Sequence, residues 1–176
     1  NVVGSSIARE SDQVLYTWAG PEIAVATTKA YTTQLALLSL LALWMARRLG
    51  TVSGEEFQAA LAAFQELPGK MEEVLSRRDS IQYLASRYFN HDSIFFIGRN
   101  LDYALGLEGS LKLKEISYIH SEAYAAGELK HGTISLIEDG TLVVALSTYG
   151  KLFSKAMSNV IEVKARGADV LSLTVE

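Results

Sequence analysis

Between residues 27 and 48, apolar side chains recur on almost every side of the helix that the pattern predicts. A helix that is apolar on most faces is typical of a protein interior, so we expect this one to be buried. Its most apolar run, Leu35–Ala46, is too short to cross a membrane, because a spanning helix needs about 20 apolar residues. The preceding stretch Gln13–Trp18 has the composition of a short strand.

Helical patterns continue as far as Phe89. Ser53-Gly-Glu-Glu56 is a capping-box pattern, with Ser53 as the N-cap and Glu56 at the third helical position. We expect this helix to run to about Leu67, where Pro68 should stop or restart it. Further helical patterns follow, so this region is the best boundary between two parts of the chain.

From residue 93 onwards, strand patterns alternate with helix patterns. Mostly apolar runs at Ser93–Ile97, Thr141–Leu146 and Val170–Val175 are typical of strands buried on both faces. Helical patterns lie between them, at Tyr103–Ile119 and Lys151–Arg166. This alternation predicts an α/β fold with a parallel sheet. Because no closing helix follows the last strand, we expect the chain to be a piece of something longer.

Composition and charge narrow the function classes. The chain has 176 residues, of which 49% are apolar, and a formal net charge of −4, which argues against a nucleic-acid-binding surface. The absence of Cys excludes disulfides, a thiol nucleophile and Cys-ligated metal sites, and the three His residues lack zinc-hydrolase spacing. No targeting or membrane-spanning segment is visible, so we expect a cytoplasmic protein with neither metal nor cofactor, which binds no nucleic acid or membrane.

The densest candidate chemistry lies on the predicted helix that contains Glu108, Lys112 and Glu115. Spacings of four and three residues put these side chains on one face, as an acid–base–acid ladder. One interpretation is a solvated ladder worth a few tenths of a kcal/mol per pair, which periodicity alone favours. The other is a carboxylate tuned by Lys112 for proton transfer at a cleft.

A second polar segment extends from His120 to Gly132. It has no clear amphipathic period, and its glycines would permit close approach of the backbone to a ligand. A lone His is more often a hydrogen-bonded structural residue than a catalyst. His131, beside Gly132 in a predicted loop, is nevertheless a better candidate than His91, which lies between Asn90 and Asp92 in a predicted surface turn.

Residues 107–132 closely resemble the signature of the glutamine–fructose-6-phosphate aminotransferases, in their sugar isomerase (SIS) half. Residues 2–6, 9–12 and 22–33 resemble the same enzymes in the same order. The resemblance implies a partial two-SIS fragment, in which each SIS domain is a parallel sheet between helices, a three-layer α/β/α fold. Residues 1–50 would then close the first SIS domain, residues 51–90 would be a helical linker, and residues 91–176 would open the second.

The resemblance also implies a reaction and roles for individual residues. The family makes glucosamine 6-phosphate from fructose 6-phosphate and glutamine, and its isomerase half converts a ketose imine into an aldose. Glu115 matches the carboxylate that moves a proton between C1 and C2, and Lys112 matches the lysine that stabilises the charged enediol-like species. His131 matches the histidine that opens the sugar ring from the neighbouring subunit, which implies a homodimer with a shared site. Val2 matches a position whose backbone lies at the sugar.

Three parts of the family pattern have no counterpart in these residues. They are the amidotransferase domain with its Cys nucleophile, the Ser/Thr-rich loop that holds the sugar phosphate, and the lysine that forms a Schiff base with the sugar. We therefore expect these 176 residues alone to be inactive or nearly so.

Two alternatives to the aminotransferase interpretation stay open. One is another SIS sugar-phosphate isomerase or deglycase, and the other is a non-catalytic SIS module that binds a sugar phosphate. A non-catalytic module of that kind needs a loop that binds the phosphate but no residue that transfers a proton. The pairing of Glu115 with Lys112 therefore favours an enzyme.

Overall fold

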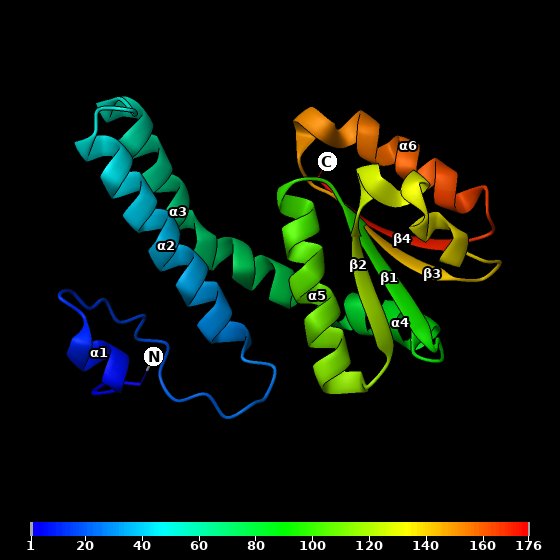
Figure 1. Cartoon of the computed structure of the whole chain (residues 1–176), viewed down its shortest axis with the longest axis horizontal. Coiled ribbons are helices and arrows are strands. Elements are labelled where there is room, and N and C mark those ends of the chain that lie inside the picture. Colours follow the sequence, from blue (N-terminus) through cyan, green and yellow to red (C-terminus); the bar gives the residue numbers. More distant parts are fainter. Residues whose placement is uncertain (1, 176) are drawn as a thin grey trace. The chain divides into compact units, whose positions relative to one another are not determined.

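The computed structural model describes residues 2–175 and divides the chain into two compact units, Asn1–Arg78 and Asp79–Glu176 (Figure 1). The first unit is helical in its described part, and the second contains a parallel sheet. The finer division at residues 50 and 90 that the resemblance implies stays a prediction.

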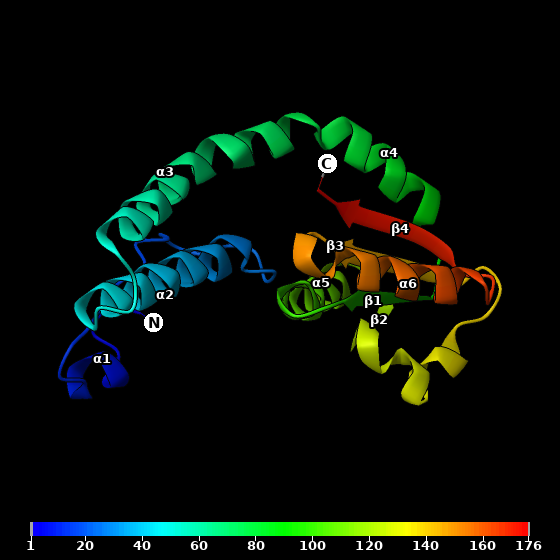
Figure 2. The same ribbon diagram turned by 90° about the horizontal axis from the view of Figure 1, so that it is seen from above.

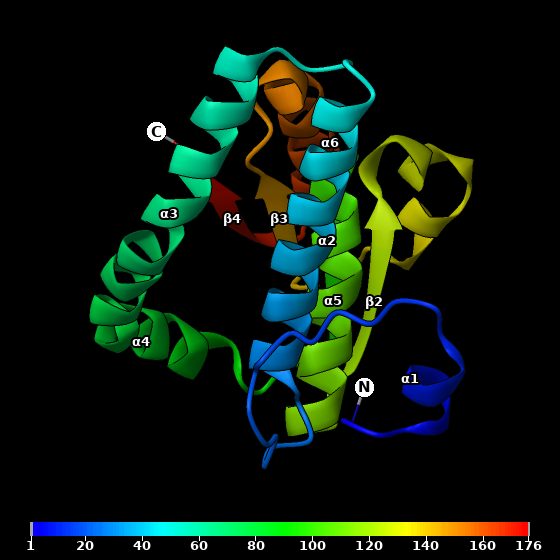
Figure 3. The same ribbon diagram turned by 90° about the vertical axis from the view of Figure 1, so that its left-hand side faces the viewer.

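Two long helices dominate the first unit. Its helices are α1 (Ser6–Glu10), α2 (Thr28–Arg48) and α3 (Gly54–Ser76). The helices α2 and α3 are joined by a tight turn, in which Gly50 has a φ of 71°, and they form a helical hairpin (Figure 3). The capping box at the start of α3 is confirmed: the N–H of Glu56 donates to Ser53 Oγ at 3.1 Å, and the N–H of Ser53 donates to Glu56 Oε2 at 2.7 Å.

The prediction that α2 is buried is wrong for this chain. None of its residues is buried, and Leu38 and Trp44 are 61% and 55% exposed. In its own unit α2 packs against α3, and a single neighbour can cover only one side of a helix that is apolar all round. Within residues 2–175, no helix has both the length and the apolar character needed to cross a membrane.

Two further predictions in the first unit are also wrong. Gln13–Trp18 forms no strand, because an extended segment becomes a strand only where another strand can share its hydrogen bonds. Pro68 does not end the helix, since α3 continues through it to Ser76. A proline removes one backbone hydrogen bond and crowds the preceding turn, and a helix can absorb this by bending, as α3 does in Figure 2.

The second unit is built on four parallel strands. They are β1 (Ser93–Gly98), β2 (His120–Ala125), β3 (Leu142–Ser147) and β4 (Asp169–Thr174), in the spatial order β2-β1-β3-β4. Its helices are α4 (Arg78–Tyr88), α5 (Leu101–Ser117) and α6 (Phe153–Lys164), with short 3-10 turns η1 (Ala126–His131), η2 (Thr133–Leu136) and η3 (Gly150–Leu152). The predicted parallel α/β fold is therefore confirmed.

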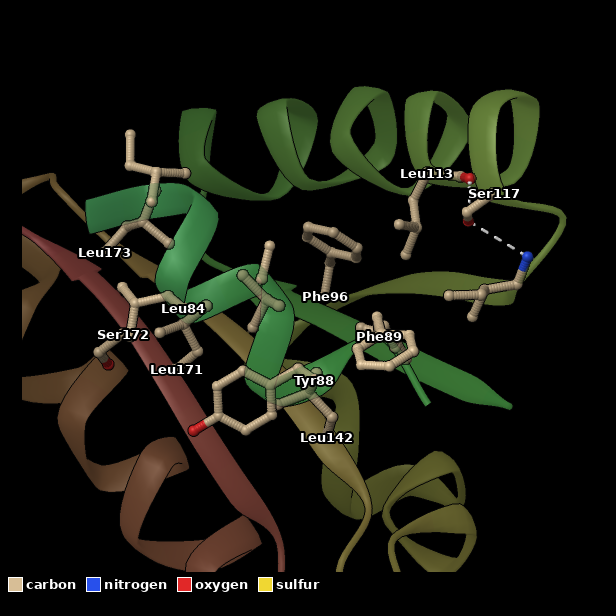
Figure 4. Close-up of a pocket in the computed structure, with 15 residues that line it drawn as sticks. Leu84, Tyr88, Phe89, Phe96, Leu113, Ser117, Leu142, Leu171, Ser172 and Leu173 are labelled. Carbon is tan, nitrogen blue, oxygen red and sulfur yellow. Dashed lines mark hydrogen bonds between the residues drawn. The ribbon is translucent and has the colours of Figure 1, made fainter. Parts of the chain in front are cut away.

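Alternate residues of the strands face two different helical layers. Phe95, Ile97, Val143 and Ala145 pack with Val160 and other apolar residues of α6 and η1 to form the main core. Their neighbours along the strands face α4 and α5 and line an apolar pocket of about 460 Å³ (Figure 4). Because both faces are covered, the central strands can be apolar throughout, which explains their continuous apolar runs.

The strand β2 lies in the polar segment for which the sequence showed no clear period. It pairs in parallel with β1 along its whole length, from Ser93 opposite His120 to Gly98 opposite Ala125. Because β2 is an edge strand, its polar side chains can reach solvent, and it lacks the apolar run that marks a central strand. The sheet thus has one strand more than the sequence predicted.

Candidate functional site

The helix α5, which carries the candidate carboxylates, packs closely on β1. Glycines at 106 and 109 face Phe96: a β-carbon built on Gly106 would lie 3.5 Å from Phe96 Cβ, and one on Gly109 would lie 3.0 Å from the ring. Small residues at these positions let the helix backbone approach the sheet. Glu108, Lys112 and Glu115 lie on another side of α5.

Glu108, Lys112 and Glu115 form a connected cluster on α5. Lys112 Nζ lies 2.8 Å from Glu115 Oε2 and 3.3 Å from Glu108 Oε1. The three side chains are only 19–26% exposed, whereas the ion pair between Lys70 and Glu66 on α3 is 63% exposed at both partners. The cluster is therefore more withdrawn from solvent than an ordinary surface ladder.

The electrostatics of the cluster maintain a positive charge at its centre. The hydrogen bond to Glu115 raises the pKa of Lys112 above its ordinary value, and the contacts with Glu108 act in the same direction against the opposing effect of desolvation. Lys112 is thus an ammonium ion at neutral pH, next to two carboxylates. This arrangement can stabilise an anion while a neighbouring carboxylate exchanges a proton.

The apolar pocket below α4 is separate from this chemistry. Leu113 and Ser117 of α5 point into it, and Leu84 and Tyr88 of α4 lie on its other side (Figure 4). The hydroxyl of Ser117 donates to the carbonyl of Leu113 and accepts from a backbone N–H. The pocket lining contains none of the predicted site residues.

His131 lies at the end of η1, beyond the carboxyl end of β2, whereas Glu115 lies near the amino end of the same strand. The helix α5 runs from the end of β1 to the start of β2, so Glu115 lies near the amino ends of these parallel strands. His131 is the last residue of η1, which follows the carboxyl end of β2, so it lies at the opposite ends of the strands. A strand of this length spans about 20 Å. The structure thus brings Lys112 and Glu115 together and leaves the chain's own His131 away from them.

His131 and Val2 are both accessible. The side chain of His131 is 76% exposed, with its Nε2 3.8 Å from Glu128 Oε2. Val2 belongs to the first unit and is 76% exposed. The structure does not test the part that either residue plays in a site, so both roles stay predictions.

A polar network between η1 and α6, in which only Asn159 is buried, was not predicted from the sequence. Arg99 Nε donates to Asn159 Oδ1 at 3.0 Å, Asn159 Nδ2 donates to Glu162 Oε2 at 3.1 Å, and Lys130 Nζ lies 2.9 Å from Glu162 Oε1. The hydrogen bond from Lys130 lowers the pKa of Glu162, with smaller contributions from Asn159 and from the charge of Arg99, against desolvation. The guanidinium lies against Gly127, where a β-carbon would be 3.2 Å away. This network attaches η1 to α6.

The chain matches the model of a known protein family. The SIS domain model matches residues 1–44 and 87–176. The chain belongs to the SIS domain family. Across residues 2–175, this SIS chain shows no group of three or more His, Asp or Glu side chains placed to hold a metal ion.

Curated relatives of this SIS chain include glutamine–fructose-6-phosphate aminotransferases. It is 58% identical over 172 residues to the enzyme of Caldanaerobacter subterraneus and 55% identical over 176 residues to that of Clostridium acetobutylicum. It spans 98–100% of its own length in these matches but only 28–29% of theirs. The prediction that the chain corresponds to the SIS part of such an aminotransferase is confirmed.

Solved structures agree with this assignment. The C-terminal domain of glucosamine-fructose-6-phosphate aminotransferase from Francisella tularensis matches with a TM-score of 0.95 and 37% identity, over 99% of this chain and 49% of that one. Glucosamine-6-phosphate deaminase from Thermotoga maritima matches less closely, with a TM-score of 0.67 and 26% identity over 96% of this chain and 49% of that one.

Proposed function

We propose that this SIS chain provides the proton-transfer centre of an enzyme that makes glucosamine 6-phosphate from fructose 6-phosphate and glutamine. The observation that carries the proposal is the half-buried cluster of Glu108, Lys112 and Glu115 on α5. The close identity to aminotransferases described as isomerizing supports the same reaction.

Glu115 acts as the base and acid of the isomerisation. Its carboxylate takes a proton from C1 of the C2 imine while the imine nitrogen gains a proton, which gives a 1-hydroxy-2-enamine, the enediol-like species. The proton then returns at C2 while the C1 hydroxyl loses its own proton, which gives the 2-amino aldose. One carboxylate can serve both carbons because they are adjacent. The rigid helix α5 holds the carboxylate in place, with Lys112 2.8 Å from it.

Lys112 provides the positive charge for the intermediate. Proton removal from C1 leaves negative charge on the substrate, and an ammonium ion already in position stabilises that charge without reorganisation. The raised pKa of Lys112 keeps it protonated during the reaction. Its two carboxylate neighbours fix the position of the ammonium group before substrate binds.

His131 opens the sugar ring and belongs to the active site of a second copy of the chain. Its position at the other end of β2 from Glu115 supports this, because one chain cannot bring the two side chains to the same sugar without a large rearrangement of the sheet. A homodimer with shared sites would combine Glu115 of one copy with His131 of the other. The backbone of Val2 would contact the same sugar.

The test of the proton-transfer role uses a full-length protein that contains these residues. We expect Glu115→Gln to lower the rate of glucosamine 6-phosphate formation by about 10²–10⁴-fold, the usual contribution of a general base. Glu108→Gln is the matched control, since it lies on the same helix and contacts the same lysine, and it should retain most of the activity. Equal losses in the two variants would refute the assigned role of Glu115.

The shared site is tested by mixing two inactive variants. Co-expressed Glu115→Gln and His131→Ala chains form mixed dimers in which one site keeps both residues, so about a quarter of the wild-type activity should return on random mixing. If each chain used its own His131, no mixed dimer would have an intact site. Failure to recover activity in confirmed mixed dimers would therefore overturn the shared site but leave the role of Glu115 standing.

A further inference from the structure

The space outside the carboxyl ends of β1 and β3, called the crevice below, lies where the strand order of this sheet changes direction. β1 continues through α5 to β2 on one side, and β3 continues through α6 to β4 on the other. In open α/β sheets, ligands bind outside the carboxyl ends of the strands at such a switch point. Two loops enclose this position, the turn after Gly98 and the loop that follows Ser147.

The carboxylate of Asp102 occupies this crevice. Asp102 lies in the first turn of α5 and is 4% exposed. Its Oδ2 accepts from the N–H of Thr148 at 2.9 Å and from the N–H of Tyr149 at 3.3 Å, and its Oδ1 accepts from the hydroxyl of Thr148. Two successive backbone N–H groups that converge on one oxygen are the arrangement by which loops bind anions.

The surrounding residues hold the carboxylate in the crevice. A β-carbon on Gly98 would lie 2.5 Å from the carbonyl carbon of Asp102, so the absence of a side chain at 98 lets the first turn of α5 come this close. Ser147, beside the two N–H donors in sequence, has a buried hydroxyl without a hydrogen-bond partner in the described residues.

We propose that this crevice is an oxyanion-binding site that the protein fills with its own carboxylate. Asp102 takes the hydrogen bonds that a phosphate group would take, and it closes this end of the sheet to phosphate ligands. The N–H groups of Thr148 and Tyr149 donate to Asp102 and are therefore not available to a ligand. Removal of the carboxylate then opens a site for inorganic phosphate or a phosphate monoester.

The experiment measures the melting temperature of the 176-residue chain in phosphate and in chloride of equal ionic strength. We expect Asp102→Ala to melt below the wild type in chloride, because three donors lose their acceptor, and to rise by roughly 5 °C in saturating phosphate. Asp102→Asn is the matched control, since its amide fills the same space and its oxygen still accepts. The wild type and Asp102→Asn should show no phosphate-specific rise.

Two results would overturn the proposal. One is an Asp102→Ala protein whose melting temperature is the same in phosphate and chloride, or which fails to fold in both. The other is a wild-type chain in which phosphate shifts the amide NMR signals of Thr148 and Tyr149, because the carboxylate would then not close the crevice. If Asp102→Ala folds only when phosphate is present, the proposal is supported.

Discussion

Replacement of Gly98 by alanine tests how closely α5 must approach the sheet. The added β-carbon would lie 2.5 Å from the carbonyl carbon of Asp102, 2.7 Å from its oxygen and 2.7 Å from the nitrogen of Tyr103. All three atoms belong to the backbone of a helix turn, so rotation of a side chain cannot relieve the clash. The first turn of α5 must move by about 1 Å to restore ordinary contact distances.

The expected cost combines two effects. Overpacking of this kind costs about 1–3 kcal/mol. The same displacement stretches the hydrogen bonds of Asp102, of which the bond from the N–H of Thr148 is 2.9 Å long, and loss of a buried bond to a charged group costs about 1.5–3 kcal/mol. We therefore expect Gly98→Ala to lower the free energy of unfolding of the second unit by about 2.5–6 kcal/mol.

Gly106→Ala is the matched control on the same helix. A β-carbon there would lie 3.5 Å from Phe96 Cβ and 3.7 Å from Leu146 Cδ1, which are ordinary van der Waals contacts. Alanine in a helix interior is more stable than glycine by about 0.5–1 kcal/mol. This variant should therefore be slightly more stable than the wild type.

Hydrogen exchange of peptides from β1 and β3 measures the effect where it should occur. For exchange limited by the stability of the unit, a loss of 3 kcal/mol makes the protected amides exchange about 100-fold faster. Both tryptophans, Trp18 and Trp44, lie in the first unit, so their fluorescence should report the same unfolding of that unit in all variants. The reasoning is refuted if Gly98→Ala exchanges no faster than the wild type, or if Gly106→Ala is the more damaged of the two.

Three further predictions concern single side chains of the second unit. Asn100 has φ 55° and ψ −122°, a conformation that suits glycine, so Asn100→Gly should raise the melting temperature through a gain of about 1 kcal/mol; an unchanged or lower value would contradict this strain. Ser121 is fully buried and its hydroxyl has no hydrogen-bond partner in the described residues, so Ser121→Ala should gain about 1 kcal/mol in urea unfolding, and a loss of that size would reveal a missed partner. Lys130 lowers the pKa of Glu162 from 4.5, so the stability from this carboxylate is complete above that pH and is lost as the pH falls through the lowered value. Glu162→Gln should therefore flatten the acid limb of a stability–pH curve, and an identical slope in the two proteins would exclude this linkage.

Features set by neighbours in sequence were predictable. The capping box at Ser53 formed as expected because both of its hydrogen bonds join residues within one turn. The apolar runs of β1 and β3 identified buried strands because a strand covered on both faces needs apolar residues at every position. In contrast, the burial of α2 could not be inferred, since it depends on how many neighbours reach that helix.

Features that depend on a partner strand were the ones missed. β2 has no apolar run because it is an edge strand, and only its pairing with β1 shows that it is a strand. Gln13–Trp18 has a strand-like composition but no strand beside it in the described part of its unit. The same composition can therefore become a strand or remain irregular, according to what lies next to it.

The same distinction between local and long-range contacts applies to the candidate site. The helical repeat by itself determined that Glu108, Lys112 and Glu115 share a face, because side chains three and four residues apart on a helix are neighbours. Only the tertiary structure decided that this face is half-buried, that His131 lies at the opposite end of the strands from Glu115, and that Asp102 reaches a loop 46 residues away. Those facts depend on the order of the strands and on the close packing of α5, which arise from contacts between residues far apart in the sequence.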